Sequence, residues 1–304
     1  MSSSLYPCHK AALRRLALSL GAAAVGFARA GAVDPAAADS YDRWLDDGCN
    51  ASMQWMRRHA PLRRDPRSLL PGARTVIATA WPYAPVGGYR HPHIADYALG
   101  RDYHRVVRDR LDALARLIAD RTGALSRPCV DTAPLPERYW AVRAGIGTVG
   151  LNGQLHVPGI GAGVVLGTLL TTLELAPDEP ISHNPCHRCG ACLRACPGGA
   201  LRGDGTLDAR RCHSYLTIEC PDDELPPGTC LGGRVYGCDI CRRVCPLEPA
   251  EPAIEPLDEF RPDPRLLAID RATLANLRSG DWRRLFADSP VRHTPARRIR
   301  RNAR

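Results

Sequence analysis

The sequence predicts an α/β domain over residues 1–180, a smaller α+β domain over 181–255 and a short helical tail over 256–304. Segments of helical and strand periodicity alternate in the first part, as is typical of α/β domains. Ten of the 13 cysteines lie between Cys186 and Cys245. A proline- and acid-rich stretch then leads into a tail that ends in arginines.

The elements of the first domain follow from hydrophobic periodicity. Helices are expected over residues 10–30, 40–59 and 104–122. The last is the clearest, because its apolar residues repeat at helical spacing and Gly123 stops it. Strands are expected over residues 75–80, 128–131 and 164–175. Residues 144–167 are rich in glycine, which marks turns or close backbone approach.

Composition places the chain among ordinary globular proteins. Of its 304 residues, 44% are hydrophobic and 24% charged, which excludes a disordered or fibrous protein. The 13 cysteines are too small a share for a disulfide scaffold. The formal net charge is +9, and Lys10 is the single lysine, so Schiff-base or Walker-type lysine chemistry is excluded beyond it.

The N-terminal sequence bears on location. No apolar run is long enough to cross a bilayer. Arg14-Arg15 and the apolar residues after them fit either an export signal or an amphipathic first helix. The mixed character of the segment favours the helix, so we expect a cytoplasmic, monomeric protein with reduced cysteines.

The cysteine spacing indicates two iron–sulfur clusters. The run C-x2-C-x2-C-x3-C-P beginning at Cys186 is that of bacterial ferredoxins, whose fourth cysteine binds the other cluster. A half-run, C-x2-C-x3-C-P, begins at Cys238, and Cys212 can supply its missing ligand. A four-cysteine zinc site is the alternative, but zinc does not call for this run with its matching half. The second domain is therefore expected to be bacterial-ferredoxin-like.

The ferredoxin rule crosses the two runs. We expect Cys186, Cys189, Cys192 and Cys245 to bind the first [4Fe–4S] cluster, and Cys196, Cys212, Cys238 and Cys241 to bind the second. Five cysteines receive no role and are expected to be buried apolar residues or surface thiols: Cys8, Cys49, Cys129, Cys220 and Cys230. Two clusters form an electron conduit, so the α/β domain is expected to hold the redox partner or substrate.

Several blocks of the chain, in order, resemble one known family. They are Trp44-Leu45-x2-Gly48, Arg64-Asp65-Pro66, Gly100-Arg101-Asp102-Tyr103-His104, Asp131-Thr132-Ala133-Pro134-x2-Glu137-Arg138, Ala144-Gly145-Ile146-Gly147, Cys212-x-Ser214-Tyr215-Leu216-Thr217 and Tyr236-Gly237-Cys238-Asp239. These blocks resemble those of the epoxyqueuosine reductases, cobalamin-dependent iron–sulfur enzymes of tRNA modification. The resemblance implies that the α/β domain binds a cobalamin.

The resemblance also implies a reaction. Electrons would pass through the clusters to cobalamin, which would drive loss of the epoxide oxygen from epoxyqueuosine in tRNA, giving queuosine. Asp131 would donate the proton, which suits a carboxyl group whose pKa burial raises; from the residues alone it could equally cap a helix. The cobalamin contacts would be Arg63, Asp131, Asn152, Leu155, Leu166, Ser214 and Asp239. His104 is expected to be structural, because Val107 breaks the Asp-x-His-x-x-Gly cobalamin motif.

The expected partners are tRNA and a reduced ferredoxin or flavodoxin, without a membrane. Arginine clusters bind phosphate without reading sequence, so the tail residues Arg297, Arg298, Arg300 and Arg301 are expected to contact tRNA, the alternative being a solvated tail. Thr148 and Leu151 stand where the family usually has tryptophan and lysine. They leave open a relative that reduces another small molecule; an electron carrier without chemistry of its own is a further alternative.

Overall fold

A four-stranded antiparallel sheet, in the order β1-β2-β6-β3, forms the centre of the larger domain. The computed structural model describes residues 6–83, 90–221, 225–250 and 253–304. The strands are β1 (Ala24–Arg29), β2 (Thr75–Pro82), β3 (Ser126–Cys129) and β6 (Val164–Thr171), with β4 (Thr148–Val149) and β5 (Leu155–His156) forming a separate pair. Neighbouring strands are joined by long connections that contain helices and loops, and not by the tight hairpins that antiparallel pairing also allows.

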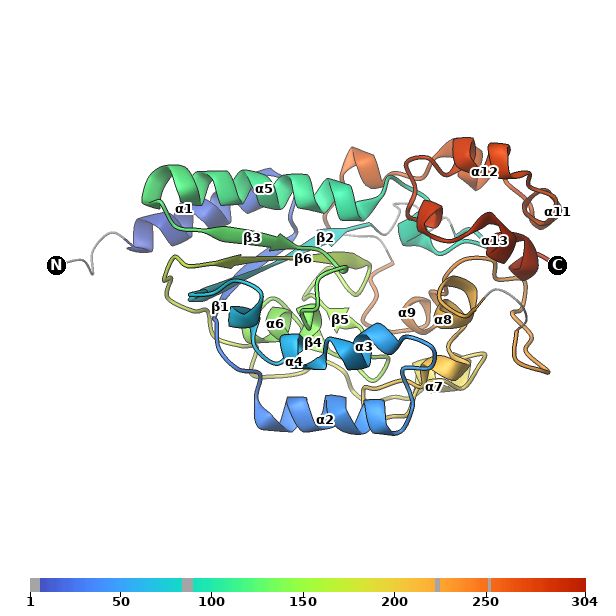
Figure 1. Ribbon diagram of the computed structural model, residues 1–304, viewed down its shortest axis with the longest axis horizontal. Helices are drawn as coiled ribbons and strands as arrows, with labels where there is room; N and C mark the ends of the chain where they lie inside the picture. The colour runs from blue at the N-terminus through green and yellow to red at the C-terminus, as the bar shows by residue number, and fades with distance from the viewer. Residues whose placement is uncertain (1–5, 84–89, 222–224, 251–252) are drawn as a thin grey trace.

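Helices cover both faces of this sheet (Figure 1). α1 (Tyr6–Ser19) and α5 (Tyr103–Thr122) lie along one face, and α6 (Glu137–Arg143) lies against the other. Alternate residues of β2 enter opposite cores: Ile77 packs on the α5 side, and Val76 packs on the α6 side with Trp140. β2 is therefore buried along its whole length, which explains its almost uniformly apolar sequence.

The structure confirms the strand over residues 75–80 and the helix over 104–122, which ends at Gly123 in a left-handed conformation. The helix expected over residues 10–30 is wrong in its second half, where the chain forms β1. Gly21, with φ of 97°, turns the chain between them. Gly26 lets α6 end close to β1: a Cβ at this position would lie 2.0 Å from the carbonyl oxygen of Ala144.

The helix expected over residues 40–59 is interrupted. The segment forms α2 (Pro35–Asp46), α3 (Gln54–Arg58) and α4 (Ala60–Arg63). Gly48 and Ala51 between α2 and α3 both have positive φ, which ends a helix. Short 3₁₀ helices elsewhere span η1 (Pro66–Ser68), η3 (Asp96–Ala98), η4 (Ala209–Arg211), η5 (Asp258–Phe260) and η6 (Pro290–His293).

The cysteine-rich segment and the C-terminal helices pack at one end of the sheet (Figure 1). The former contains α7 (Ala191–Ala195), α8 (His213–Ile218) and α9 (Ile240–Arg243), the latter α10 (Pro264–Leu267), α11 (Arg271–Ala275), α12 (Ser279–Leu285) and α13 (Ala296–Asn302). Apolar residues of the C-terminal helices share a core with Ile94, Leu99 and Val235. The C-terminal segment is thus a packed layer over the other two parts of the chain.

A buried ion-pair cluster joins the larger domain to the cysteine-rich one. The carboxylate of Asp96 pairs with both Arg242 and Arg243, and the Asp96 backbone N–H donates to Asp239 at 2.7 Å. Their side chains are each less than 10% exposed. Removing one partner from such a cluster leaves a buried charge uncompensated, so these residues hold the two parts together.

Among the helices in the described part of the chain, none combines the length and the apolar character that a membrane span requires. Arg14, from the segment weighed above as an export signal, is engaged in the fold. Its guanidinium donates to the carbonyl of Val25 and to Asp178, each at 2.7 Å.

Candidate functional site

The loop between β3 and α6 presents Asp131. Asp131 has a φ of 53°, a left-handed conformation that aspartate tolerates better than most residues. Its backbone N–H donates to Glu137 Oε2 at 3.1 Å, which closes the loop. The helix-cap interpretation is wrong, because the N-cap of α6 is Pro136 and the Asp131 carboxylate points elsewhere.

The Asp131 carboxylate faces the start of α5. Its Oδ2 accepts a hydrogen bond from the Tyr103 hydroxyl at 2.6 Å and lies 3.3 Å from His104 Nε2. The side chain is 62% exposed, yet desolvation by surrounding protein is the largest single influence on its pKa. The carboxylate is therefore open to solvent on one side, where a substrate can reach it, while protein surrounds the rest of the residue.

The pKa of Asp131 differs from expectation. Burial acts to raise it, but the hydrogen bonds from His104 and Tyr103 outweigh burial, so the pKa is lowered. The expected raised pKa is therefore wrong for this arrangement. Two neighbours have raised pKa values instead: burial and the charge of Asp131 raise the pKa of Glu137 to about 8, and the pKa of His104 is raised as well.

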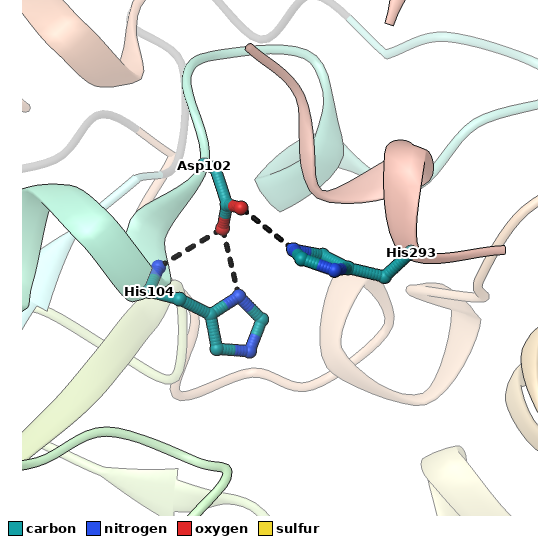
Figure 2. A group of neighbouring side chains, drawn as sticks. All are labelled: Asp102, His104 and His293. Atoms are coloured by element: carbon teal, nitrogen blue, oxygen red, sulfur yellow. Dashed lines mark hydrogen bonds and ion pairs between the residues drawn. The ribbon is translucent and has the colours of Figure 1, made fainter. Parts of the chain in front are cut away.

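His104 lies between the carboxylates of Asp102, shown in Figure 2, and Asp131. Its Nδ1 is 2.7 Å from Oδ1 of Asp102, the N-cap of α5, while Nε2 faces Asp131. Oδ2 of Asp102 accepts from His293 Nε2 at 2.7 Å. Burial acts to lower the pKa of His104, but Asp102 and Asp131 raise it to about 9. For Asp102, burial is outweighed by these two histidines, and its pKa falls to about 2.

Sequence reasoning gave no site role to Tyr103, His104, Asp102, Glu137 or His293. Tyr103, His104, Asp102 and Glu137 lie in two of the sequence blocks that carry the family resemblance, and this resemblance was the signal that could have identified them. His293 had none, because it is 191 residues from its partner Asp102.

Two buried polar atoms near the Asp131 loop have no partner among the described atoms: Nε of Arg63 and Oε1 of Glu137. The Nη1 atom of Arg63 is 3.4 Å from the carbonyl of Leu135 in the same loop. Buried polar atoms normally find partners, so unpaired ones close to the solvent-open Asp131 carboxylate suit a ligand rich in amide groups, such as a corrin. The residues present thus fit a cobalamin beside Asp131.

The other expected cobalamin contacts lie in different surroundings. Asn152 is 2% exposed and bonds to the carbonyl of Cys241, and Asp239 belongs to the buried ion-pair cluster. Leu155 lies in the core beneath α6. Leu166 on β6 and Ser214 on α8 are half-buried. These positions as cobalamin contacts stay predictions.

The cysteines interact in two groups. Burial raises the pKa of Cys245, and the charges of Cys186, Cys192 and Cys189 raise it further. The pKa of Cys241 rises to about 12, first through burial and then through Cys238, Cys212 and Cys196. Thiols that oppose one another's ionisation suit iron, because a metal deprotonates its thiolate ligands and supplies the compensating charge.

The remaining cysteines lie apart from these groups in their interactions. Cys49, Cys129 and Cys220 are buried, and Cys230 is exposed. The side chain of Cys8 lies outside those that the structure describes. Thr148 and Leu151, the departures from the family pattern, are both buried, and Thr148 Oγ1 donates to Asn184 at 3.1 Å.

The arginines of the tail are engaged within the fold. Arg301 donates to the carbonyls of Leu216 and Pro221, Arg298 to that of Ile218 and Arg300 to that of Leu277. Arg297 is exposed on α13. Charged donors at the carbonyl end of a helix stabilise it, so α13 caps α8.

We expect Arg301→Ala to lower the free energy of unfolding by about 1–3 kcal/mol, because it removes charged hydrogen bonds to the carbonyls of Leu216 and Pro221. Thermal unfolding of the loaded protein measures this. Arg304→Ala, at an exposed position beside it, is the control. Unchanged stability together with a tRNA affinity whose salt slope drops by about one would instead assign Arg301 to phosphate binding.

Known proteins resemble this chain over almost its full length. The family model described as "Epoxyqueuosine reductase QueG, DUF1730" matches residues 63–132, and that of the "4Fe-4S double cluster binding domain" matches 185–248. The epoxyqueuosine reductase of Gloeobacter violaceus is 39% identical, over 97% of this chain and 94% of its own length.

Solved structures agree with this. A crystal structure of epoxyqueuosine reductase with an epoxyqueuosine-modified tRNA-Tyr stem loop superposes with a TM-score of 0.87 at 30% identity, covering 97% of this chain and 79% of that one. The Bacillus subtilis epoxyqueuosine reductase, with a TM-score of 0.85, 30% identity and the same coverage, has an aspartate-bearing catalytic loop swung out of the active site.

Proposed function

The chain belongs to the epoxyqueuosine reductase family, and from this premise we propose that it reduces epoxyqueuosine in tRNA to queuosine. It is an oxidoreductase with two [4Fe–4S] clusters. The observation that carries the proposal is the carboxylate of Asp131, which is open to solvent and bonded to Tyr103 and His104. A simple electron carrier has no use for such a group.

The reaction needs electrons and protons in equal number. Both C–O bonds of the epoxide break, a C=C bond forms, and the oxygen leaves as water after taking up two electrons and two protons. The clusters supply single electrons, and a bound cobalamin supplies a reduced metal centre for breaking the carbon–oxygen bond. The protein must deliver protons at the departing oxygen.

Asp131 is the residue that we assign to proton delivery. Its Oδ2 is held by Tyr103, which fixes the direction of the carboxylate, while its other oxygen remains for the substrate. Glu137 holds the backbone of the loop through the N–H of Asp131. The movable aspartate-bearing catalytic loop of the Bacillus subtilis relative supports this role.

The grouping of the thiols supports the expected assignment of the cluster ligands. We assign the first cluster to Cys186, Cys189, Cys192 and Cys245, and the second to Cys196, Cys212, Cys238 and Cys241. Arg63, with its unpaired Nε, would hold cobalamin amide groups beside Asp131. A reduced ferredoxin or flavodoxin would supply electrons, and the reaction belongs in the cytoplasm, where tRNA is modified and thiols stay reduced.

We expect the anaerobic, iron- and cobalamin-loaded protein to form queuosine when given a reductant and a tRNA stem loop that carries epoxyqueuosine. Nucleoside analysis of the digested RNA measures the product. An unmodified stem loop is the control for background. Reduced clusters and bound corrin without any queuosine formed would contradict the proposal and favour a different small substrate.

A further inference from the structure

The proposed reaction gives no role to one cluster of titratable side chains near Asp131. Asp102, His104 and His293 form an unbroken chain of contacts (Figure 2), and Nε2 of His104 extends this chain to Asp131. Asp102 is 5% exposed, His104 21% and His293 56%, so the chain runs from the solvent side through a buried carboxylate to the site. A histidine held between two carboxylates is an arrangement suited to moving a proton.

We propose that His104 supplies the proton that Asp131 passes to the departing oxygen, and that Asp102 and His293 hold His104 in position for this transfer. The proposal rests on the proposed function, because it assigns the source of a proton which that reaction consumes. His104 acts through Asp131 and is therefore a positioning and proton-supplying residue, whereas Asp131 is the catalytic one.

The transfer balances without any further reactant. His104 begins as an imidazolium, with Nδ1–H bonded to Asp102 and Nε2–H facing Asp131. The carboxylate of Asp131 receives the Nε2 proton of His104 and passes it to the departing oxygen as a C–O bond of the epoxide breaks, so Asp131 is a carboxylate again after the transfer. His104 ends as the neutral Nδ1–H tautomer and regains its proton from solvent before the second protonation or the next turnover.

The geometry restricts His104 to this role. Its Nδ1 is fixed by Asp102, and the ring of Tyr103 stacks on it with centroids 4.0 Å apart and planes at 26°. The ring is therefore held so that Nε2 aims at Asp131. Asp102 cannot rotate either, since its second oxygen is held by His293 at 2.7 Å. A serine-protease-type carboxylate orients its histidine in the same way.

Charge favours the imidazolium at neutral pH. The pKa of His104 is raised to about 9, so the imidazolium is present below this pH and is lost as the pH rises through it. The titratable or charged groups that act on His104 and Asp131 come from several elements: Asp102, Tyr103, His293, Glu137, Arg138, Glu219 and Tyr236. We expect the reduction rate constant to fall above about pH 9.

A metal ion is the rival occupant of this place. One ligand atom each from Asp102, His104 and His293 lie within 4.8 Å of one another. However, Nδ1 of His104 and Nε2 of His293 each lie 2.7 Å from an oxygen of Asp102, which is the distance of a shared proton. The proton chain therefore accounts for every contact, and bound metal becomes an outcome of the test.

The test compares single-turnover rate constants of the loaded enzyme on the epoxyqueuosine stem loop between pH 6 and 10. His104→Gln should lower the rate constant by about 10²-fold. It should also remove the fall near pH 9, leaving the affinity for the stem loop unchanged. Asp102→Asn keeps a capping oxygen on α5 but loses the charge, so the fall should move to lower pH. His9→Gln, on α1, is the histidine control.

Each outcome of this test supports or overturns the proton-supply role of His104. If the wild-type enzyme forms queuosine and His104→Gln has the same rate constant and pH profile, His104 does not supply the proton. The proposed function would then still stand. A stoichiometric divalent ion lost from both His104→Gln and Asp102→Asn would also overturn it. No queuosine formed by the wild type would overturn the proposed function and this inference with it.

Discussion

Asp131→Asn is expected to lower the rate constant of epoxyqueuosine reduction by about 10²–10⁴-fold, because an amide has no proton to release to the departing oxygen. Asparagine has the same shape, tolerates the left-handed φ of 53° and still accepts the hydrogen bond from Tyr103. The fold and the cofactors should therefore survive. Single-turnover kinetics, with iron and corrin measured on the same sample, check both halves of the expectation.

Asp120→Asn is the matched control for this substitution. Asp120 is exposed on α5, away from the start of the helix that faces Asp131. The Asp120→Asn enzyme should reduce epoxyqueuosine at the wild-type rate. An Asp131→Asn enzyme of undiminished rate would remove Asp131 from proton delivery, and one that lost its corrin would show that the residue mainly holds the cofactor.

Double cysteine substitutions are expected to reveal the crossing of the two runs. If Cys196 belongs with Cys238, replacing both by alanine destroys one cluster, and about half of the iron remains. If Cys186 belongs to the other cluster, the Cys186→Ala/Cys196→Ala protein loses both. Iron and sulfide analysis after anaerobic reconstitution measures this. Both doubles should abolish turnover, because a broken conduit delivers no electrons to the site.

An uncrossed assignment, in which each cysteine run binds its own cluster, predicts the opposite result. If Cys196 bound the same cluster as Cys186, the Cys186→Ala/Cys196→Ala protein would keep about half of its iron. The Cys196→Ala/Cys238→Ala protein would then lose both clusters. Cys230→Ala is the control, because Cys230 is exposed and receives no ligand role. It should keep the full iron content and the full rate.

Local sequence signals were sufficient wherever the chain follows its own periodicity. The helix over residues 104–122 was predictable because its apolar residues repeat at helical spacing and Gly123 ends it, and the strand over 75–80 was predictable because it is a short apolar run that ends at a proline. Residues 24–29 were mistaken for helix because their small and apolar residues fit both periods. Pairing with β2, far along the chain, decides for a strand.

The site divides in the same way. The cysteine run and Asp131 carry local motifs, so both were visible in the sequence. The partners of Asp131 were not assigned, because they come from α5, and His293 comes from the far end of the chain. The lowered pKa of Asp131 could not be predicted either, since it depends on the hydrogen bonds from His104 and Tyr103 that outweigh burial. Tertiary contacts alone create both effects.

The shared burial of Asp96, Arg242 and Arg243 limits how this protein can be engineered. The cysteine-rich domain is not an interchangeable module: when it is excised or grafted onto another oxidoreductase, Arg242 and Arg243 lose the carboxylate of Asp96 and keep only those of Asp239 and Glu248. A chimaeric protein that contains this domain would also need Asp96 and the segment around it, or apolar residues in place of both arginines. For the same reason, a substitution at Asp96 should affect cluster loading and substrate turnover together, because its partners Arg242 and Arg243 lie within the cysteine run that begins at Cys238.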